Sequence, residues 1–331
     1  MDIQAALFEK LRPLIPKGKT LAEYLGNLLY LSNDSIYRRL RGETQLNLQE
    51  LQSICLHFGL SADTLINLRK DGQITFDVSR MGTSSTSFFD FVKRLYEDIT
   101  FLKNTGNSYI IYSGKDVPFM YNLLFPRLFA FKHYIWMQVF AQSPEFNEKV
   151  FDPNINDPEL ILTANKIVEL YCDIPSTEIW NEENINALLI QIDFYRNSRL
   201  FSSTEQINAI YDEIDELLVH LRRQAEAGTK FLPGENVELR KGNYKLFLNQ
   251  IILSENVILV KAGDRPRAYI NYSVINHLST KDHEFCSEVE SYLNNIIRRS
   301  TQISLENIKM RTIFFNNQHE KVAWYRKKLH G

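Results

Sequence analysis

Apolar residues recur at helical spacing through the first sixty residues of this 331-residue chain. Spacings of three and four residues place side chains on one face of a helix, so each run predicts a helix with one buried face. The predicted apolar positions are Ile3, Ala6, Leu7, Leu11 and Leu14, then Leu21, Leu25 and Leu28, then Ile36 and Leu40, and finally Leu48, Leu51, Ile54, Cys55 and Phe58. Thr20 with Glu23, and Asn47 with Glu50, have the spacing of capping boxes. A fifth short helix is predicted from Ser61.

The third of these helices has a polar outer face. In the segment LSNDSIYRRLRGE, residues 31–43, Ser32 is a good N-cap and Gly42 a good C-cap residue. Ile36 and Leu40 are four residues apart, which leaves the side chains between them available to solvent. A short capped helix with a thin apolar seam and several arginines is typical of a helix that reads DNA.

The pattern changes after residue 70. Residues 71–87 hold two glycines and many hydroxyl side chains, which predicts a linker with a possible short strand in ITFDV. A helix should then begin near Ser85, followed by a buried strand from Asn107, two helices meeting at Pro126, and helices over 157–173, 181–198 and 204–227. Three β-rich runs follow from Asn243, and two further helices end the chain. Their short connections predict neighbouring antiparallel strands.

These elements predict a mainly α protein with an α+β C-terminal portion. We expect a helical DNA-binding domain over 1–70, a linker over 71–87, a mostly helical regulatory or dimerisation region over 88–230, and an α+β region over 231–331. The last region would hold a small antiparallel sheet packed on helices, and it can form one domain with residues 88–230.

Two segments of the central region allow a functional and a structural interpretation. The aromatic block from Phe119 to Phe140 can be the wall of an effector pocket or ordinary core, and core is favoured because aromatic side chains dominate buried area. The seam from Ile207 to Leu221 spans two heptads, so it can form a dimer contact or pack within its own domain. Packing within the domain is favoured, since two heptads are short.

Composition limits the class of protein. The 21 Phe and 16 Tyr can fill a large core, while the net charge of −2 argues against a wholly basic coat for nucleic acid. Three well-separated cysteines, no secretory leader and no uninterrupted apolar span predict a cytoplasmic protein with no membrane segment. The common catalytic, cofactor and metal-binding motifs are missing, so we expect no enzyme activity, no cofactor and no metal site.

The N-terminal seventy residues resemble the Cro/repressor-type helix-turn-helix regulators of the XRE family. The matching segments are TLAEYLG, LSNDSIYRRLRGE and LQELQSICLHFGLSADTL. The resemblance implies a five-helix, lambda-repressor-like domain that binds double-stranded DNA. This chain departs from the family pattern by four additional residues, Asn27–Tyr30, after Gly26. Four residues are about one helical turn, so we expect the supporting helix to be longer by a turn.

The resemblance also assigns roles to side chains. Base contacts would come from the start of the third helix, with Arg38 the best candidate for a bidentate guanine contact. Phosphate contacts would position the domain without reading sequence. The base-contact candidates are Asn33, Asp34, Ser35, Tyr37 and Arg38, and the phosphate-contact candidates are Lys17, Lys19, Arg39 and Arg41.

We therefore interpret the chain as a sequence-specific transcriptional regulator that acts as a homodimer. Residues 1–70 hold nine Lys and Arg against seven Asp and Glu, so a single copy is only weakly basic. The C-terminal portion would dimerise or respond to a small-molecule or protein effector. The alternative is a protein-interaction module whose helix-turn-helix-like bundle does not bind DNA.

Overall fold

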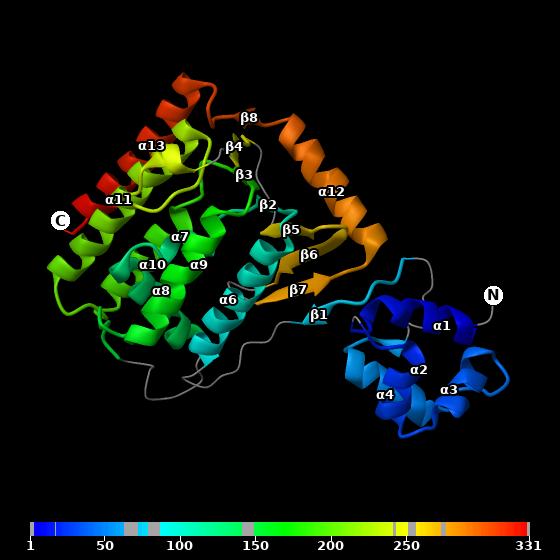
Figure 1. Ribbon diagram of the computed structural model, residues 1–331. Helices are drawn as coiled ribbons and strands as arrows, with labels where there is room; N and C mark the ends of the chain where they lie inside the picture. Colours follow the sequence, from blue (N-terminus) through cyan, green and yellow to red (C-terminus); the bar gives the residue numbers. More distant parts are fainter. Residues whose placement is uncertain are drawn as a thin grey trace. The chain divides into compact units, whose positions relative to one another are not determined.

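The chain folds into two compact units, Met1–Thr75 and Phe76–Gly331 (Figure 1). The computed structural model describes residues 3–16, 18–62, 72–78, 87–140, 149–240, 243–250, 256–272 and 276–329. Each unit is described by itself.

The described part of the N-terminal unit is helical. Its helices are α1 (Ile3–Leu11), the 3₁₀ helix η1 (Arg12–Leu14), α2 (Leu21–Leu29), α3 (Asn33–Leu40) and α4 (Leu48–Phe58). Both predicted capping boxes are present, Thr20 with Glu23 and Asn47 with Glu50. Gly59 ends α4 with a left-handed backbone, φ 62°. The fifth predicted helix lies almost entirely outside the described residues.

The core of this unit forms where the helices meet. Its fully buried side chains include Leu11, Leu25, Ile36 and Ile54, one from each α-helix. The prediction that Leu48 is buried is wrong, since Leu48 is 82% exposed. Leu48 is the first residue of α4, and an apolar stripe predicts which face is buried but not how far along the helix its neighbours reach.

The C-terminal unit contains most of the elements. Its helices are α6 (Ser87–Thr105), α7 (Phe119–Asn122), α8 (Pro126–Phe140), α9 (Pro158–Cys172), α10 (Asn186–Asn197), α11 (Thr204–Ala227), the 3₁₀ helix η3 (Val237–Leu239), α12 (His283–Arg298) and α13 (Ile308–Lys327). Its strands are β1 (Asp77–Val78), β2 (Ser108–Ser113), β3 (Ser176–Trp180), β4 (Tyr244–Leu248), β5 (Val257–Ala262), β6 (Arg265–Asn271), β7 (His277–Thr280) and β8 (Thr301–Gln302).

These strands form one mixed sheet in the order β1-β7-β6-β5-β2-β3-β4-β8. β2, β3 and β4 are parallel neighbours, and the other pairs are antiparallel. The α+β character is therefore confirmed, but the sheet is larger than expected and is not purely antiparallel. The predicted pairing of β4 with β5 is wrong, because β4 pairs with β3 in register Ser176↔Tyr244, whereas β5 and β6 are the antiparallel pair expected.

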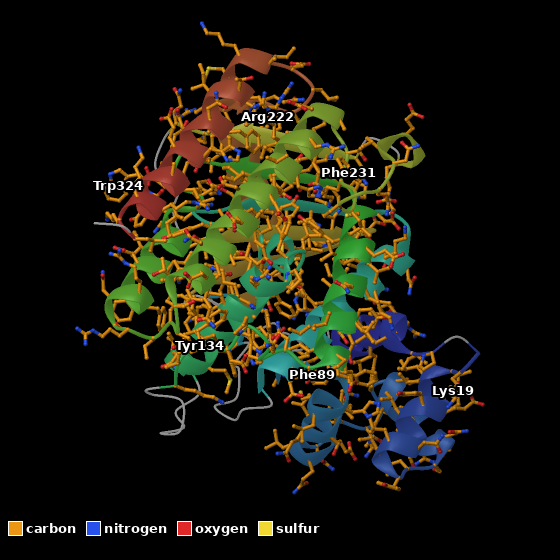
Figure 2. All side chains as sticks on the ribbon, turned by 90° about the vertical axis from the view of Figure 1, so that its left-hand side faces the viewer. Lys19, Phe89, Tyr134, Arg222, Phe231 and Trp324 are labelled. Atoms are coloured by element: carbon orange, nitrogen blue, oxygen red, sulfur yellow. The ribbon has the colours of Figure 1, made fainter. Side chains whose placement is uncertain are left out.

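Helices cover both faces of the sheet. Along β2 the buried side chains alternate, with Ile110 and Tyr112 on the larger helical side and Ile111 on the other. α12 covers that second face through Val289 and Leu293, on the side opposite α6, α8 and α9 (Figure 1). Figure 2 shows the side chains that fill the space between the sheet and its helices.

The heptad seam of α11 packs inside the C-terminal unit. Its residues Ile207, Ile210, Ile214, Leu217 and Leu221 are all buried, and α11 lies against α13 and α8. The interpretation as internal packing is confirmed. Among the helices in the described ranges, none has both the length and the apolar character needed to cross a bilayer.

Candidate nucleic-acid interface

The supporting helix α2 is extended as predicted. Residues 27–29 continue the helix beyond Gly26, and Tyr30 ends it with a left-handed backbone, φ 56°. The N–H groups of Tyr30 and Leu31 both donate to the Gly26 carbonyl. A Cβ at Gly26 would lie 3.0 Å from the carbonyl oxygen of Leu31, so glycine lets the turn pass close to the helix. α2 and α3 are thereby joined by a tight turn.

α3 is capped at both ends by its own sequence. The Ser35 N–H donates to Ser32 Oγ at 3.3 Å at the N-terminus. At the C-terminus Gly42 has φ 75°, and the N–H of Glu43 donates to the Arg38 carbonyl at 2.9 Å. These are the N-cap and the glycine C-cap that the sequence predicts.

The outer face of α3 carries most of the predicted base-contact residues. Ile36 is buried, whereas Asn33, Asp34 and Arg38 are exposed and Tyr37 is 45% exposed. With 3.6 residues per turn, these four exposed side chains lie within an arc of roughly 140°. Ser35 is the exception, because it is partly buried and its hydroxyl bonds Ser32 Oγ at 2.9 Å.

Two of the predicted cationic side chains have acidic neighbours. Arg38 Nε lies 3.3 Å from Asp34 Oδ2, and both side chains are more than half exposed. The Arg41 guanidinium bonds both carboxylate oxygens of Glu43, at 2.6 and 3.1 Å, which raises the pKa of Arg41 and lowers that of Glu43. Such solvent-exposed pairs are weak, so a phosphate can replace the carboxylate.

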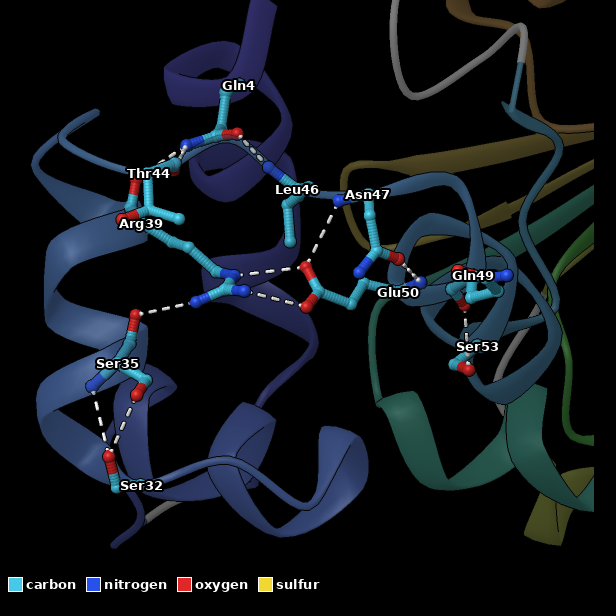
Figure 3. A network of polar contacts seen from close by, with 10 residues as sticks. All are labelled: Gln4, Ser32, Ser35, Arg39, Thr44, Leu46, Asn47, Gln49, Glu50 and Ser53. Carbon is cyan, nitrogen blue, oxygen red and sulfur yellow. Dashed lines mark hydrogen bonds and ion pairs between the residues drawn. The ribbon is translucent and has the colours of Figure 1, made fainter.

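Arg39 differs from the other candidates because its guanidinium is used inside the unit (Figure 3). It donates to both Glu50 oxygens, at 3.0 and 2.7 Å, and to the Ser35 carbonyl at 3.1 Å. Only 13% of the Arg39 side chain and 11% of the Glu50 side chain are exposed. We therefore reassign Arg39 from phosphate contact to joining α3 and α4. It lies three residues after the buried Ile36, on the inner flank of the helix.

Gln4 is a structural residue that the sequence pattern did not reveal. Its side chain is buried and bonds the end of α3 and the loop that follows at three points in all (Figure 3). Its Nε2 donates to the carbonyls of Arg39 and Thr44, at 2.8 and 2.9 Å, and its Oε1 accepts from the Leu46 N–H at 2.7 Å. A polar residue on an otherwise apolar helix face, beside Leu7 and Leu11, was the available signal.

The remaining two basic candidates lie in the connector between α1 and α2. Lys19 is exposed, and its Nζ is 5.8 Å from the centre of the Tyr24 ring. It is labelled in Figure 2. Lys17 lies outside the described residues. Across the described part of the chain, no group of three or more His, Cys, Asp and Glu side chains is placed to hold a metal ion.

Comparison with known proteins finds one similarity. A family model described as the BetR domain, a helix-turn-helix-type DNA-binding family, matches residues 11–92. No curated protein and no solved structure matches the chain. The match spans α2, the turn, α3 and α4, and so agrees with the helix-turn-helix class predicted from the sequence. Residues 11–92 of this chain are similar to a DNA-binding regulatory domain.

Proposed function

We propose that this chain is a sequence-specific transcriptional regulator that binds operator DNA as a homodimer. In this proposal α3 enters the major groove and reads base edges, as in Cro/repressor-type proteins. The C-terminal unit sets the distance between two α3 helices by dimerisation, or responds to an effector. A dimer is required because the N-terminal region has too little net positive charge to bind tightly as a single copy.

One observation carries the proposal: contacts hold α3 at both ends and along its inner flank while its polar face is exposed. Caps fix both ends, Gln4 fixes the following loop, and the Arg39–Glu50 pair fixes the inner flank. The opposite face presents Tyr37 and Arg38 to solvent. A preorganised helix can read bases without first becoming ordered.

Selection from a random duplex library with the full-length chain tests the proposal. Arg38→Ala should lower discrimination between the selected site and random duplex by about 1–3 kcal/mol, since a bidentate base contact is lost. Lys19→Ala should weaken binding to both duplexes about equally and reduce the salt slope by roughly one. Lys166→Ala, at an exposed position on α9, is the control with no expected effect.

The results have distinct meanings. Selection of a common duplex sequence, together with the two different patterns for Arg38→Ala and Lys19→Ala, supports base readout. If no sequence is enriched and neither substitution changes binding to duplex at low salt, DNA reading by α3 is refuted.

Two exposed leucines favour a second candidate function, docking of a protein partner. Leu48 and Leu56 are 82% and 77% exposed and lie eight residues apart on α4. If this surface docks a protein partner, Leu48→Ser combined with Leu56→Ser should abolish association of the chain with that partner. Binding of the chain to duplex DNA should then be absent or unchanged. If α3 reads the major groove, Arg38→Ala should reduce binding to duplex DNA more than the double leucine substitution does.

A further inference from the structure

The C-terminal unit contains a cavity of about 230 Å³ between its helices and its sheet. α6, α7 and α8 supply one side, and β2, β5 and β6 supply the other. All lining residues belong to the C-terminal unit, so the cavity does not depend on how the two units are placed. An apolar cavity of about 150 Å³ holds benzene, which has six non-hydrogen atoms. In proportion to its volume, this cavity can hold a ligand of roughly nine or ten non-hydrogen atoms.

The cavity wall is aromatic. Phe88, Phe91, Phe119 and Trp136 line it. The rings of Phe91 and Phe119 meet edge-on at 5.4 Å, and those of Phe88 and Trp136 are also 5.4 Å apart. Ile110 and Val260 line it from the sheet. Flat aromatic and branched aliphatic walls suit a planar apolar body.

Within the described ranges of the chain, two deeply buried polar atoms on cavity-lining residues have no hydrogen-bond partner. They are the indole Nε1–H of Trp136, a donor, and the amide Oδ1 of Asn122, an acceptor. Trp136 is 2% exposed and Asn122 is 3% exposed. Leaving such groups unpaired is unfavourable, so a ligand in the cavity whose polar groups reach these two atoms would be stabilised by both contacts.

Lys132 supplies a cation beside Trp136. The two residues are four apart on α8, so their side chains share a face of the helix. Lys132 Nζ donates to Gln191 Oε1 at a long 3.3 Å, which leaves ammonium donors available. Burial lowers the pKa of Lys132, while the negative charge of Asp116 opposes this shift and favours the charged form. Asp98, which is exposed, stands at the edge of the cavity.

We propose that this cavity binds a small organic carboxylate with a planar apolar body. The carboxylate would accept hydrogen bonds from Lys132 and from Trp136 Nε1, and a hydroxyl or amide on the ligand would donate to Asn122 Oδ1. The apolar body would lie among Phe88, Phe91 and Phe119. If this ligand is the effector of the regulator, the inference rests on the sensing role given to the C-terminal unit in the proposed function.

Calorimetric titration of the full-length chain with three matched probes tests the inference. Phenylacetate, 2-phenylethanol and 2-phenylethylammonium share one aromatic body, fit the capacity of roughly nine or ten non-hydrogen atoms, and differ in the charge of the head group. The carboxylate should bind at least tenfold more tightly than the alcohol, and the ammonium compound should bind least. Because no DNA is present, failure here is separate from failure of DNA binding.

Two substitutions locate the site. Lys132→Met keeps the length of the side chain and should remove the preference for the carboxylate over the alcohol. Trp136→Phe keeps the aromatic wall. It should weaken binding of the carboxylate several-fold more than it weakens binding of the alcohol. Lys166→Met is the matched control and should bind like the parent chain.

Thermal unfolding followed by circular dichroism identifies variants that have lost the fold, and those are replaced by Lys132→Gln and Trp136→Tyr. Equal binding of the carboxylate and the alcohol, tighter binding of the ammonium compound, or a preference that survives both Lys132 substitutions overturns the inference. Failure of all three probes to bind also overturns it.

Discussion

The Arg39–Glu50 pair shows how a single contact can fix the orientation of α3. Both charged groups are largely removed from water, and each is held by more than one hydrogen bond. Glu50 Oε2 also accepts from the Asn47 N–H, so the same carboxylate caps α4. Removing one partner of a buried pair leaves the other charge desolvated and unpaired, whereas removing both avoids that cost.

We therefore expect Arg39→Met and Glu50→Gln each to destabilise the N-terminal unit by about 2–4 kcal/mol. The double variant Arg39→Met with Glu50→Gln should be more stable than either single variant. Hydrogen exchange of peptides from residues 1–75 measures these differences, and Arg12→Met, from an exposed pair with Glu9, is the control. A phosphate-contacting Arg39 would instead leave stability unchanged and alter the salt dependence of DNA binding.

At the scale of elements, the turn between α2 and α3 combines an extended helix with a strained residue. Tyr30 has φ 56°, a conformation that a side chain with a Cβ disfavours, and it is 95% exposed. The ring packs against almost nothing in the described part of the chain, so side-chain packing does not offset the strain in the backbone. The position is therefore one where the residue type affects stability through the backbone alone.

Tyr30→Asn should stabilise the N-terminal unit by about 0.5–1 kcal/mol, since asparagine tolerates the left-handed region. Tyr30→Val should destabilise it by about 1 kcal/mol, because a β-branched side chain tolerates that region poorly. Hydrogen exchange of the α2 and α3 amides measures both. Shifts of the same sign in the two variants would contradict the left-handed turn.

At the scale of the whole molecule, the C-terminal unit buries several titratable groups in its core. Glu178 on β3 is fully buried and accepts hydrogen bonds from the hydroxyls of Tyr121, Tyr171 and Tyr244. Burial raises the pKa of Glu178 and lowers that of the nearby Lys230 to about 8. Core groups of this kind couple the stability of the unit to pH.

His220 should make the stability of the C-terminal unit depend on pH. It is buried on α11, with Nε2 placed 2.9 Å from the Phe231 carbonyl, and burial lowers its pKa from 6.5 to about 4. The folded state favours the neutral ring, so the unfolded state binds more protons between these values. The stability is therefore fully present above pH 6.5 and is lost as pH falls towards 4, by about 3 kcal/mol in total.

His220→Gln should reduce this acid-dependent loss while keeping a hydrogen-bond donor near Phe231. Urea unfolding at several pH values between 4 and 7 measures it. Tryptophan fluorescence reports on the C-terminal unit alone, because all three tryptophans lie there. The exposed His283→Gln is the control, and an unchanged pH slope in His220→Gln would exclude His220 as the source.

Local signals in the sequence determined much of the helix-turn-helix region. The caps at Thr20, Ser32 and Asn47, the extension of α2 and the burial of Ile36 follow from interactions over three or four residues, which sequence spacing records directly. The outer face of α3, with Asn33, Tyr37 and Arg38, was predictable for the same reason.

Only the tertiary structure decided features that depend on distant residues. Arg39 meets Glu50 instead of solvent, and Gln4 meets a loop about forty positions away in the chain. β4 pairs with β3, although α10 and α11 lie between them in the sequence. The periodicity of a strand indicates only which face it buries and not which strand it pairs with. The aromatic block is mostly core, yet Phe119 and Trp136 line a cavity that is completed by α6 and the sheet. Spacing along the chain fixes local geometry, and the contacts between elements fix the rest.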